Sequence, residues 1–375
     1  MDKDNDASED IYLNITQIIT KYGYPVEQYT VVTSDEYVLK LFRIQGNGPV
    51  LFLMHGLLGS ADDWISPGPG FGLGFLLADK GYDVWMGNAR GNKYSNRNTG
   101  METSENKFWD FSWHEIGVFD IPAMIDHVLY ITNNKKLIYI GYSQGNTAFL
   151  VMCSMRPEYN EKISLMISLS AVAWMSNSKN NIFNLLAPFS NQLYKYSDTL
   201  GIHTLFPDNT ILKLLQRAFC GDTVSAFIVC QHILFLLGGV NYSQINIKRF
   251  PVICNHFPSG SSVKQIVHYG QLIVSGHFRH FDYGSLNLLK YGFPEPPIYP
   301  VEKITAPVAI FFSKGDWLAN KKDVQKLQSK LSNQILFYTI PNKHFNHFDY
   351  LYAKETKSLV LPQIVLLIQQ YSVFN

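Results

Sequence analysis

The stretch that most constrains this chain runs from residue 137 to 149 and joins an apolar strand to a serine between glycines. Leu137 to Ile140 is a short apolar run rich in strand-forming residues, which is typical of a buried strand. The pattern Gly-x-Ser-x-Gly then occupies residues 141–145, and small and apolar residues follow that can continue as a helix. As a bare pattern it is weak. A serine on a sharp strand-to-helix turn needs small neighbours two positions away, so this context predicts that Ser143 is a nucleophile raised above a sheet.

Strand and helix patterns alternate along the chain on both sides of Ser143. The predicted strands are residues 27–33 and 37–44, paired as an antiparallel hairpin, and then 50–54, 82–86, 137–140, 164–171, 307–312 and 334–340. The predicted helices are residues 11–22, 71–80, 116–131, 322–331 and 360–371. Repeated strand–helix–strand units predict an α/β fold with a mostly parallel sheet and helices on both faces.

The alternation stops between about Trp174 and Pro300. This segment is rich in Phe, Leu and Tyr, has helical patches at 211–218 and 224–237, and contains no clear strand. We interpret it as an inserted helical cap. The predicted organisation is therefore a first part of the core at 1–173, a cap or lid at 174–300, and a second part of the core at 301–375.

Charge and hydropathy exclude some classes of protein. The formal net charge of +1 argues against a nucleic-acid surface or an electrostatic membrane anchor. Only 16% of residues are charged, which fits an apolar surface that contacts lipid, although a large core lowers the charged fraction too. No apolar run reaches the roughly 18 uncharged residues that a transmembrane helix requires, so no such segment is predicted.

The four cysteines are too few for a disulfide scaffold, and no Cys-x-x-Cys pair indicates zinc. Cys220 and Cys230 close a short loop and can pair in an oxidising compartment. Cys153 lies in the helical stretch after Ser143 and is interpreted as a small core residue.

The N-terminus is acidic and polar and lacks the apolar run of a signal peptide, so we expect a mature form or an incomplete gene model. Tripeptides beginning at Asn14 and Asn241 fit the N-glycosylation pattern and favour secretion slightly, because such tripeptides also arise by chance.

A nucleophilic serine needs a base, and the base needs a third group to orient it. On a parallel sheet these partners follow the carboxyl ends of later strands. Asp316 follows the strand that ends at residue 312, and His347 lies in the loop after the last strand. Asp323 is the rival acid, but it lies on the next helix, where an acidic side chain is expected to face solvent. His344 is the rival base, and His347 is preferred because it is closer to the following helix.

The oxyanion of an acyl-transfer intermediate needs preorganised N–H donors. In this architecture one donor is the residue after the nucleophile, Gln144, and the other lies in the loop after an earlier strand, at Leu57. Both residues contribute backbone amides, so their side chains are not decisive. His55 and Gly56 would also suit a simple tight turn, which is compatible with the donor role.

Longer motifs carry a resemblance to the acid lipase family, which includes lysosomal acid lipase and gastric lipase, within the α/β-hydrolase superfold. The motifs before the serine are His55-Gly-Leu-Leu58 with Trp64-Ile65, Gly81-Tyr-Asp-Val-Trp85, Gly87-Asn-Ala-Arg-Gly-Asn92, Phe108-Trp109, Phe111-Ser112, Glu115, Asp120-Ile-Pro-Ala123 and Ile125-Asp126. Those after it are Asn255-His-Phe-Pro-Ser-Gly-Ser-Ser-Val263, Ser275-Gly276, Phe281-Asp-Tyr-Gly284, Gly315-Asp-Trp-Leu-Ala-Asn320 and Asn346-His-Phe-Asp349. Together they span almost the whole chain.

The resemblance implies Ser143 as nucleophile, Asp316 as acid and His347 as base, with oxyanion amides at Leu57 and Gln144. It also implies that Cys220 pairs with Cys230. The chain departs from the family at Tyr142, where the elbow usually has histidine, and at Asn320, where aspartate is common. The first departure leaves the nucleophile intact but can alter the floor of the pocket.

The function expected from these observations is a lipase that hydrolyses carboxylic esters of neutral lipids, triacylglycerols and in a second place steryl esters, without a metal or organic cofactor. The apolar stretch 226–239 would cover the site in water and open at a lipid surface. The alternatives are an esterase for small soluble esters and a non-catalytic lipid-binding protein. We expect a monomeric glycoprotein, secreted or lysosomal, that meets its substrate at an oil–water or membrane interface and has no nucleic-acid partner.

Overall fold

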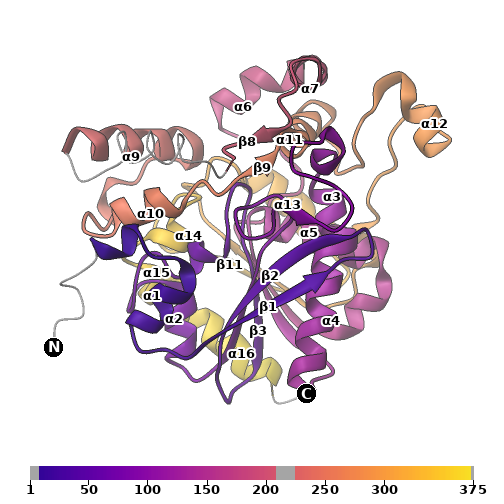
Figure 1. Ribbon diagram of the computed structural model, residues 1–375. Coiled ribbons are helices and arrows are strands. Elements are labelled where there is room, and N and C mark those ends of the chain that lie inside the picture. Colours follow the sequence, from indigo (N-terminus) through magenta and orange to yellow (C-terminus); the bar gives the residue numbers. More distant parts are fainter. Residues whose placement is uncertain (1–7, 208–223, 373–375) are drawn as a thin grey trace.

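The structure, a computed structural model, describes residues 8–207 and 224–372, with side chains in the second range from residue 228 onward. A central twisted sheet carries helices on both faces, and a largely helical cap covers one edge of it (Figure 1). The predicted helical patch 211–218 and Cys220 lie outside the described residues, so their predictions stay untested.

The sheet contains nine strands within the described residues, in the order β1-β2-β4-β3-β6-β7-β10-β11, with β5 paired to β2. Their bounds are β1 Val26–Val32, β2 Tyr37–Ile44, β3 Val50–Met54, β4 Asp83–Gly87, β5 Arg97–Asn98, β6 Leu137–Tyr142, β7 Ile163–Leu169, β10 Val308–Phe312 and β11 Gln334–Thr339. From β4 to β11 every neighbouring pair is parallel, whereas β1, β2 and β4 pair antiparallel. The predicted hairpin and parallel strands are therefore confirmed, with ends that differ by at most two residues.

Helices bury both faces of the sheet, as Figure 1 shows for α3, α4 and α5 on one side and α1, α2 and α16 on the other. The first layer consists of α3 Trp113–Glu115, α4 Ile121–Thr132, α5 Gln144–Met155 and α13 Lys321–Lys330. The second consists of α1 Ile15–Lys21, α2 Leu73–Ala78, α14 Asp349–Tyr352, α15 Thr356–Leu359 and α16 Leu361–Ser372. This arrangement gives the chain two hydrophobic cores, one on each face of the sheet.

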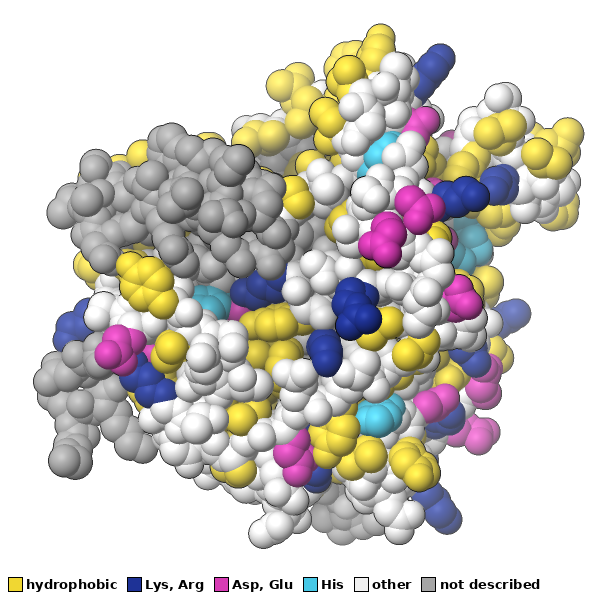
Figure 2. Space-filling view, in the orientation of Figure 1, with side chains coloured by type: hydrophobic (Ala, Val, Ile, Leu, Met, Phe, Trp, Pro, Cys, Tyr) yellow, Lys and Arg dark blue, Asp and Glu magenta, His cyan; other side chains and the backbone are white. Residues whose placement is uncertain are grey.

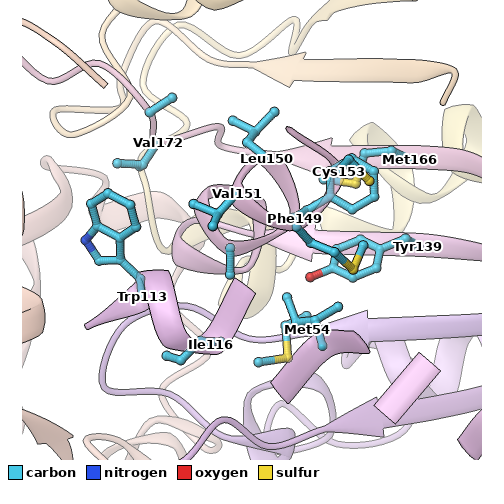
Figure 3. Packing of buried hydrophobic residues seen from close by; sticks show 14 of the residues in the cluster. Met54, Trp113, Ile116, Tyr139, Phe149, Leu150, Val151, Cys153, Met166 and Val172 are labelled. Atoms are coloured by element: carbon cyan, nitrogen blue, oxygen red, sulfur yellow. The ribbon is translucent and has the colours of Figure 1, made fainter. Parts of the chain in front are cut away.

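The helix after Ser143 is buried along almost its whole length. Figure 3 shows its residues Phe149 and Val151 among the side chains of Tyr139, Met54 and Trp113, all members of one buried cluster. A helix that is buried on all sides is enclosed by other elements, and α5 is packed between the sheet and the layer formed by α3 and α4.

The predicted helix 116–131 is interrupted near its start. Residues Ile116–Asp120 form a π-helical turn, and regular α4 begins only at Ile121. The wide turn places the Asp120 carboxylate in the core, where it accepts hydrogen bonds from the backbone N–H and Nε of buried Arg90 at 2.9 and 2.7 Å. Apolar periodicity alone does not reveal such a turn.

Between β7 and β10 the chain leaves the main sheet, and we use the name cap for residues 174–300. Its elements are α6 Asn181–Leu186, α7 Ser190–Thr199, β8 Thr204–Leu205, α9 Val224–Gly238, α10 Phe250–His256, β9 Ser261–Ser262, α11 Val263–Ser275 and α12 Asn287–Tyr291. The expectation of a cap without strands is wrong in one detail, because β8 and β9 form a short antiparallel pair. Two-residue strands are too short to produce an alternating pattern.

Helix α10 is tied to the core by buried polar contacts. Arg249 Nη1 lies 2.5 Å from Asp10 Oδ2, and His256 Nδ1 lies 2.6 Å from Asp62 Oδ2. Among the helices of the described part of the chain, none is both long and apolar enough to cross a membrane.

Candidate active site

Ser143 stands between β6 and α5 with φ +50° and ψ −113°, a backbone conformation that residues with a side chain rarely adopt. The two flanking glycines are explained by close packing. A Cβ at position 145 would lie 2.3 Å from the carbonyl oxygen of Met54, and one at position 141 would lie 2.6 Å from Asn146 Oδ1. Only glycine lets α5 approach the end of β3 this closely, so the pattern is required by the sharp turn.

Three residues that are far apart in the sequence meet at the carboxyl edge of the sheet. His347 Nε2 lies 2.9 Å from Ser143 Oγ, and His347 Nδ1 lies 3.0 and 3.1 Å from the two carboxylate oxygens of Asp316. All three side chains are buried. The chain of contacts from carboxylate to imidazole to hydroxyl is the arrangement that activates a serine as a nucleophile.

The surroundings of Asp316 keep it ionised. Burial by itself would raise the pKa of its carboxyl group, but the adjacent His347 and hydrogen bonds hold that pKa below its ordinary value. The backbone N–H groups of Leu318 and Ala319 each donate to Oδ1 at 2.9 Å. A carboxylate fixed in this way can orient an imidazole and balance the charge that it gains.

The two rival residues lie elsewhere. Asp323 is buried, which corrects the expectation that it faces solvent, and its carboxylate accepts hydrogen bonds from the backbone and side chain of Asn177 at 2.8 and 2.7 Å. It therefore fixes the start of the cap. His344 is exposed at the surface, three residues from the buried His347.

The loop after β3 approaches the serine, as the oxyanion prediction requires. A Cβ at position 56 would lie 3.1 Å from the Cβ of Ser143. In the described part of the chain, the amide N–H groups of Leu57 and Gln144 have no hydrogen-bond acceptor within the protein. They are therefore available to an oxyanion.

His55 has a part in this loop that the sequence did not indicate. Its Nε2 accepts a hydrogen bond from the N–H of Ala89 at 3.0 Å, so the proton is on Nδ1, which donates to the carbonyl of Gly56 at 2.7 Å. Burial lowers the pKa of His55 to about 4, and the ring stays neutral. A neutral imidazole bonded on both sides holds the turn that carries Leu57.

Both departures from the family pattern have a structural explanation. The hydroxyl of Tyr142 donates to the carbonyl oxygen of His347 at 3.0 Å, and its ring lies 5.2 Å from the imidazole. Tyr142 thus supports the loop of the base. Asn320 is the N-cap of α13, where its side chain accepts a hydrogen bond from the N–H of Lys322 at 3.0 Å.

Ser143 and His347 open onto a cavity of about 160 Å³ between the core and the cap. Its wall is mostly apolar and includes Leu58 and Val172 from the core side and Met175, Leu186, Leu237 and Ile273 from the cap. Asp63 is the acidic residue of this lining. Burial raises the pKa of Asp63 to about 7, and Tyr352 donates a hydrogen bond to it at 3.0 Å. Such a cavity suits an apolar substrate with one reactive polar group.

The end of α9 contacts both loops that carry the partners of the serine. The carbonyl oxygen of Gly238 accepts hydrogen bonds from the N–H of His347 at 3.1 Å and from the N–H of Trp317 at 3.3 Å. The carbonyl of Gly239 accepts one from the side chain of Asn346 at 2.9 Å. Side-chain patterns in the sequence do not predict this link, because it is made by backbone groups.

Two more side chains near the site were missed. Gln265 of α11 accepts a hydrogen bond from the side chain of Gln144 at 2.6 Å, which ties the cap to the start of α5. Ser170, directly after β7, lies within 2.7 Å of both Asp316 and His347. A polar residue at the end of the strand beside β6 was the available signal, but the predicted strand 164–171 included Ser170 in its interior.

The remaining predicted residues are distributed over the surface and the core. Asn14 is exposed, whereas Asn241 is only 5% exposed and its amide donates to Asp349 Oδ2 at 2.7 Å, which argues against a glycan there. Cys153 is buried in the core with an unpaired thiol, and Cys230 is buried in the cap. Residues 8–207 and 224–372 contain no group of three or more His, Cys, Asp or Glu side chains arranged to hold a metal ion.

Comparisons with known proteins agree with this geometry. The family model for the α/β-hydrolase fold matches residues 49–350, and the model for a partial α/β-hydrolase lipase region matches residues 15–68. The chain is 39% identical to Lipase 1 of Drosophila melanogaster over 362 residues, covering 95% of this chain and 80% of that protein. It is 38% identical to gastric triacylglycerol lipase of Bos taurus over 370 residues, covering 96% of this chain and 91% of that protein.

Among solved structures, a candidate lipase from Sulfolobus solfataricus superposes with a TM-score of 0.60 at 13% identity, over 92% of this chain and 94% of that one. A membrane phospholipase A that is described as a bacterial virulence factor gives a TM-score of 0.52 at 12% identity, over 97% and 92% of the two chains. At these identities the likeness concerns the fold alone.

Proposed function

The chain belongs to the acid lipase family of α/β-hydrolases and is a lipase, and from this premise we propose that Ser143, Asp316 and His347 are its catalytic residues. The observation that carries the proposal is the run of contacts from Asp316 through His347 to Ser143 Oγ, the last of them 2.9 Å long, at the mouth of an apolar cavity.

The reaction proceeds in two steps. Ser143 Oγ attacks the ester carbonyl carbon while His347 Nε2 takes the hydroxyl proton, and Asp316 stabilises the imidazolium. When the tetrahedral intermediate collapses, the bond to the alcohol oxygen breaks and His347 gives the proton to the leaving alcohol. Water then attacks the acyl-enzyme, His347 takes a proton from it, and the fatty acid leaves as Ser143 regains its proton.

The amides of Leu57 and Gln144 bind the negatively charged oxygen of each tetrahedral intermediate. Two observations support this assignment: both N–H groups lack an acceptor within the described protein, and the His55 ring holds the loop of Leu57 beside Ser143. Donors that are fixed before the reaction require no reorganisation when charge develops.

The substrates are neutral lipids, with triacylglycerols as the principal class and steryl esters as the second. The apolar lining of the cavity suits an acyl chain, and the relatives include gastric triacylglycerol lipases. Assays with tributyrin, triolein and cholesteryl oleate over a pH series separate these classes. A nitrophenyl ester series that peaks at two to four carbons would instead favour an esterase for small soluble substrates.

The cap is the surface that meets the lipid. Figure 2 shows apolar side chains gathered at the top of the molecule, over α6 and α7. Large apolar residues that are at least 40% exposed on α6, α7 and α9 and between α6 and α7 are Ile182, Leu185, Leu186, Phe189, Leu193, Tyr196, Ile228, Val229, Ile233 and Leu236. An apolar area of this kind on one side of a molecule marks a contact site for an apolar surface.

A secreted or lysosomal location completes the proposal. It is supported by the gastric lipases among the relatives and by the exposed Asn14, whose side-chain Oδ1 caps α1 while Nδ2 remains available to a glycan. The pairing of Cys220 with Cys230 and the monomeric state belong to the same proposal.

Replacement of the nucleophile tests the function. We expect Ser143→Ala to lower kcat on tributyrin by at least about 10⁴-fold with little change in thermal stability. Ser154→Ala is the matched control, because Ser154 is a buried serine of α5, the helix that follows Ser143, and bonds to the carbonyl of Val151. Turnover by Ser143→Ala close to that of the unmodified enzyme would contradict the assignment.

A further inference from the structure

Ser170 is the first residue after β7 and is 1% exposed. Its Oγ lies 2.5 Å from Asp316 Oδ2 and 2.7 Å from His347 Nδ1. A single hydroxyl group thus contacts both the acid and the base of the proposed triad.

The position of this hydroxyl follows from the register of the sheet. Tyr142 and Leu169 are partners across the parallel strands β6 and β7, so Ser143 and Ser170 leave neighbouring strands side by side. The N–H of Ser143 donates to the carbonyl of Leu169 at 3.1 Å, and the N–H of Ser170 donates to the carbonyl of Phe311 at 3.2 Å. The sheet therefore directs Ser170 toward the loop that carries Asp316.

The backbone of Ser170, like that of Ser143, has a positive φ. Its φ is +54°, in the left-handed region that favours glycine. The neighbouring Asn146 side chain donates to the carbonyl of Ser170 at 3.4 Å and to that of Leu169 at 2.8 Å, which helps to hold the conformation. Strained residues of this kind gather at functional sites, where the conformation places a group that function needs.

The hydrogen-bond roles of this hydroxyl are determined by its partners. In the resting enzyme His347 Nε2 must accept the proton of Ser143, so the imidazole proton is on Nδ1. The Nδ1–H group then donates to Ser170 Oγ as well as to Asp316, and the hydroxyl of Ser170 donates to Asp316 Oδ2. Because two backbone amides already occupy Oδ1, Ser170 provides the further donor to Oδ2.

We propose that Ser170 is a positioning residue of the catalytic machinery, which holds the imidazole of His347 and the carboxylate of Asp316 in place through hydrogen bonds to both. The proposal rests on the proposed function, since it gives Ser170 a role only through the triad. Ser170 is absent from the lining of the cavity, so it acts on catalysis and not on substrate binding.

Loss of this hydroxyl has a consequence for the pH dependence. Without it, Asp316 loses an O–H donor and the Nδ1–H group of His347 loses one of its acceptors, so the electrostatic balance between the carboxylate and the imidazole changes. Other titratable groups that face the site are Tyr142, Asp63, Asp349 and Tyr352. All of them stay in place in a Ser170 variant, so a change in the profile reports on Ser170 itself.

The test measures kcat and KM of Ser170→Ala and Ser170→Gly on a soluble nitrophenyl ester between pH 4 and 9. We expect kcat to fall about tenfold near neutral pH and KM to stay within about twofold. We also expect the acidic limb of kcat/KM to move, because a hydrogen bond to a charged group is strong. Ser170→Gly relieves the backbone strain, so it stays folded even if Ser170→Ala does not.

Ser164→Ala is the matched control, because Ser164 is a buried serine of β7 that bonds to the carbonyl of Leu137, away from the triad. It should keep both the rate and the pH profile. Ser170 variants with an unmoved acidic limb overturn the proposal, whether or not kcat falls. If that result occurs while Ser143→Ala is inactive, the proposed function stands; an active Ser143→Ala overturns the function itself.

Discussion

Two helices of the same cap, α11 and α9, meet the active site in opposite ways. The side chains of α11 bond to the core: Gln265 to Gln144, the hydroxyl of Tyr269 to that of Thr147 at 2.9 Å, and Lys264 to Asp110 at 2.6 Å. The end of helix α9 reaches the loops of Asp316 and His347 instead through backbone carbonyls, those of Gly238 and the following Gly239. The cap is therefore attached by a fixed wall on one side and by a short backbone connection on the other.

The burial of the two helices differs in the same sense. Val267 and Leu272 of α11 are buried, and His268 stacks on Trp113 with ring centroids 3.8 Å apart. On α9, in contrast, Ile233 and Leu236 are half exposed to solvent. An element with few buried contacts opens at a low free energy, so we expect α9 to move while α11 stays.

The largest expected effect comes from removing the side chain of Trp113, on which α11 packs. Trp113→Ala should lower the free energy of unfolding by about 4 kcal/mol, because a fully buried indole is removed from beneath α11. Urea denaturation measures this change. Phe235→Ala, which removes a buried aromatic ring from α9, should cost less than about 1 kcal/mol globally if α9 opens alone. Equal losses in the two variants would show that α9 is as integral as α11.

The next effect depends on pH and concerns His280, which follows α11 in the chain. Burial, and then the neighbouring His114, lower the pKa of His280 to about 4. Its ring stacks on Tyr299 at 4.4 Å. Since the unfolded chain binds a proton near pH 6.5 and the folded protein only near pH 4, this histidine stabilises the fold fully above pH 6.5. That stability, about 3 kcal/mol, is lost as the pH falls from 6.5 to 4.

Lowering the pH from 7.5 to 4.5 should therefore reduce the melting temperature of His280→Phe less than that of the unmodified protein. Thermal melts at the two pH values measure this difference. The comparison must be made between variants, because Asp63 and Asp349 have pKa values raised by burial to about 7 and favour the fold in acid. His277→Phe is the control, because His277 is exposed three residues earlier. If His277→Phe showed the same reduced sensitivity of its melting temperature to pH, the effect could not be assigned to His280.

The smallest effect on stability, and the most informative one on α9, is expected from Leu236→Ser. Leu236 is 54% exposed, so the free energy of unfolding should change by less than about 0.5 kcal/mol. Hydrolysis of a soluble ester should be unchanged, whereas hydrolysis of emulsified triolein should fall several-fold. Leu289→Ser on α12 controls for surface apolarity, because Leu289 is 82% exposed. Equal losses on emulsion in both variants would contradict a specific role for α9.

The sequence carried most of the fold and the central residues of the site, because both depend on strong side-chain patterns. Apolar runs located the strands, and the alternation with helices determined that Ser143, Asp316 and His347 would meet at one edge of the sheet. Spacing alone ranked the acid and the base, and the longer motifs gave the family.

Features that depend on tertiary contacts could not be predicted. Asp323 is an ordinary helix-surface residue by pattern, yet Asn177 of the cap buries it. Tyr142 stood out as a departure, but its bond to the carbonyl of His347 depends on a residue 205 positions away. Ser170 resembled the interior of a strand, and its left-handed conformation has no signature in composition.

The Gly238 carbonyl, which joins the acid loop to the base loop, bears on how this enzyme can be engineered and how it can diverge. A contact made by the main chain is indifferent to which side chains precede it, so the exposed sequence of α9 can be exchanged to suit another lipid. Its length cannot, because one inserted or deleted residue would carry the carbonyl away from the amides of Trp317 and His347. Chimeras that graft a foreign α9 should therefore conserve the register of this junction before they conserve any residue within the helix.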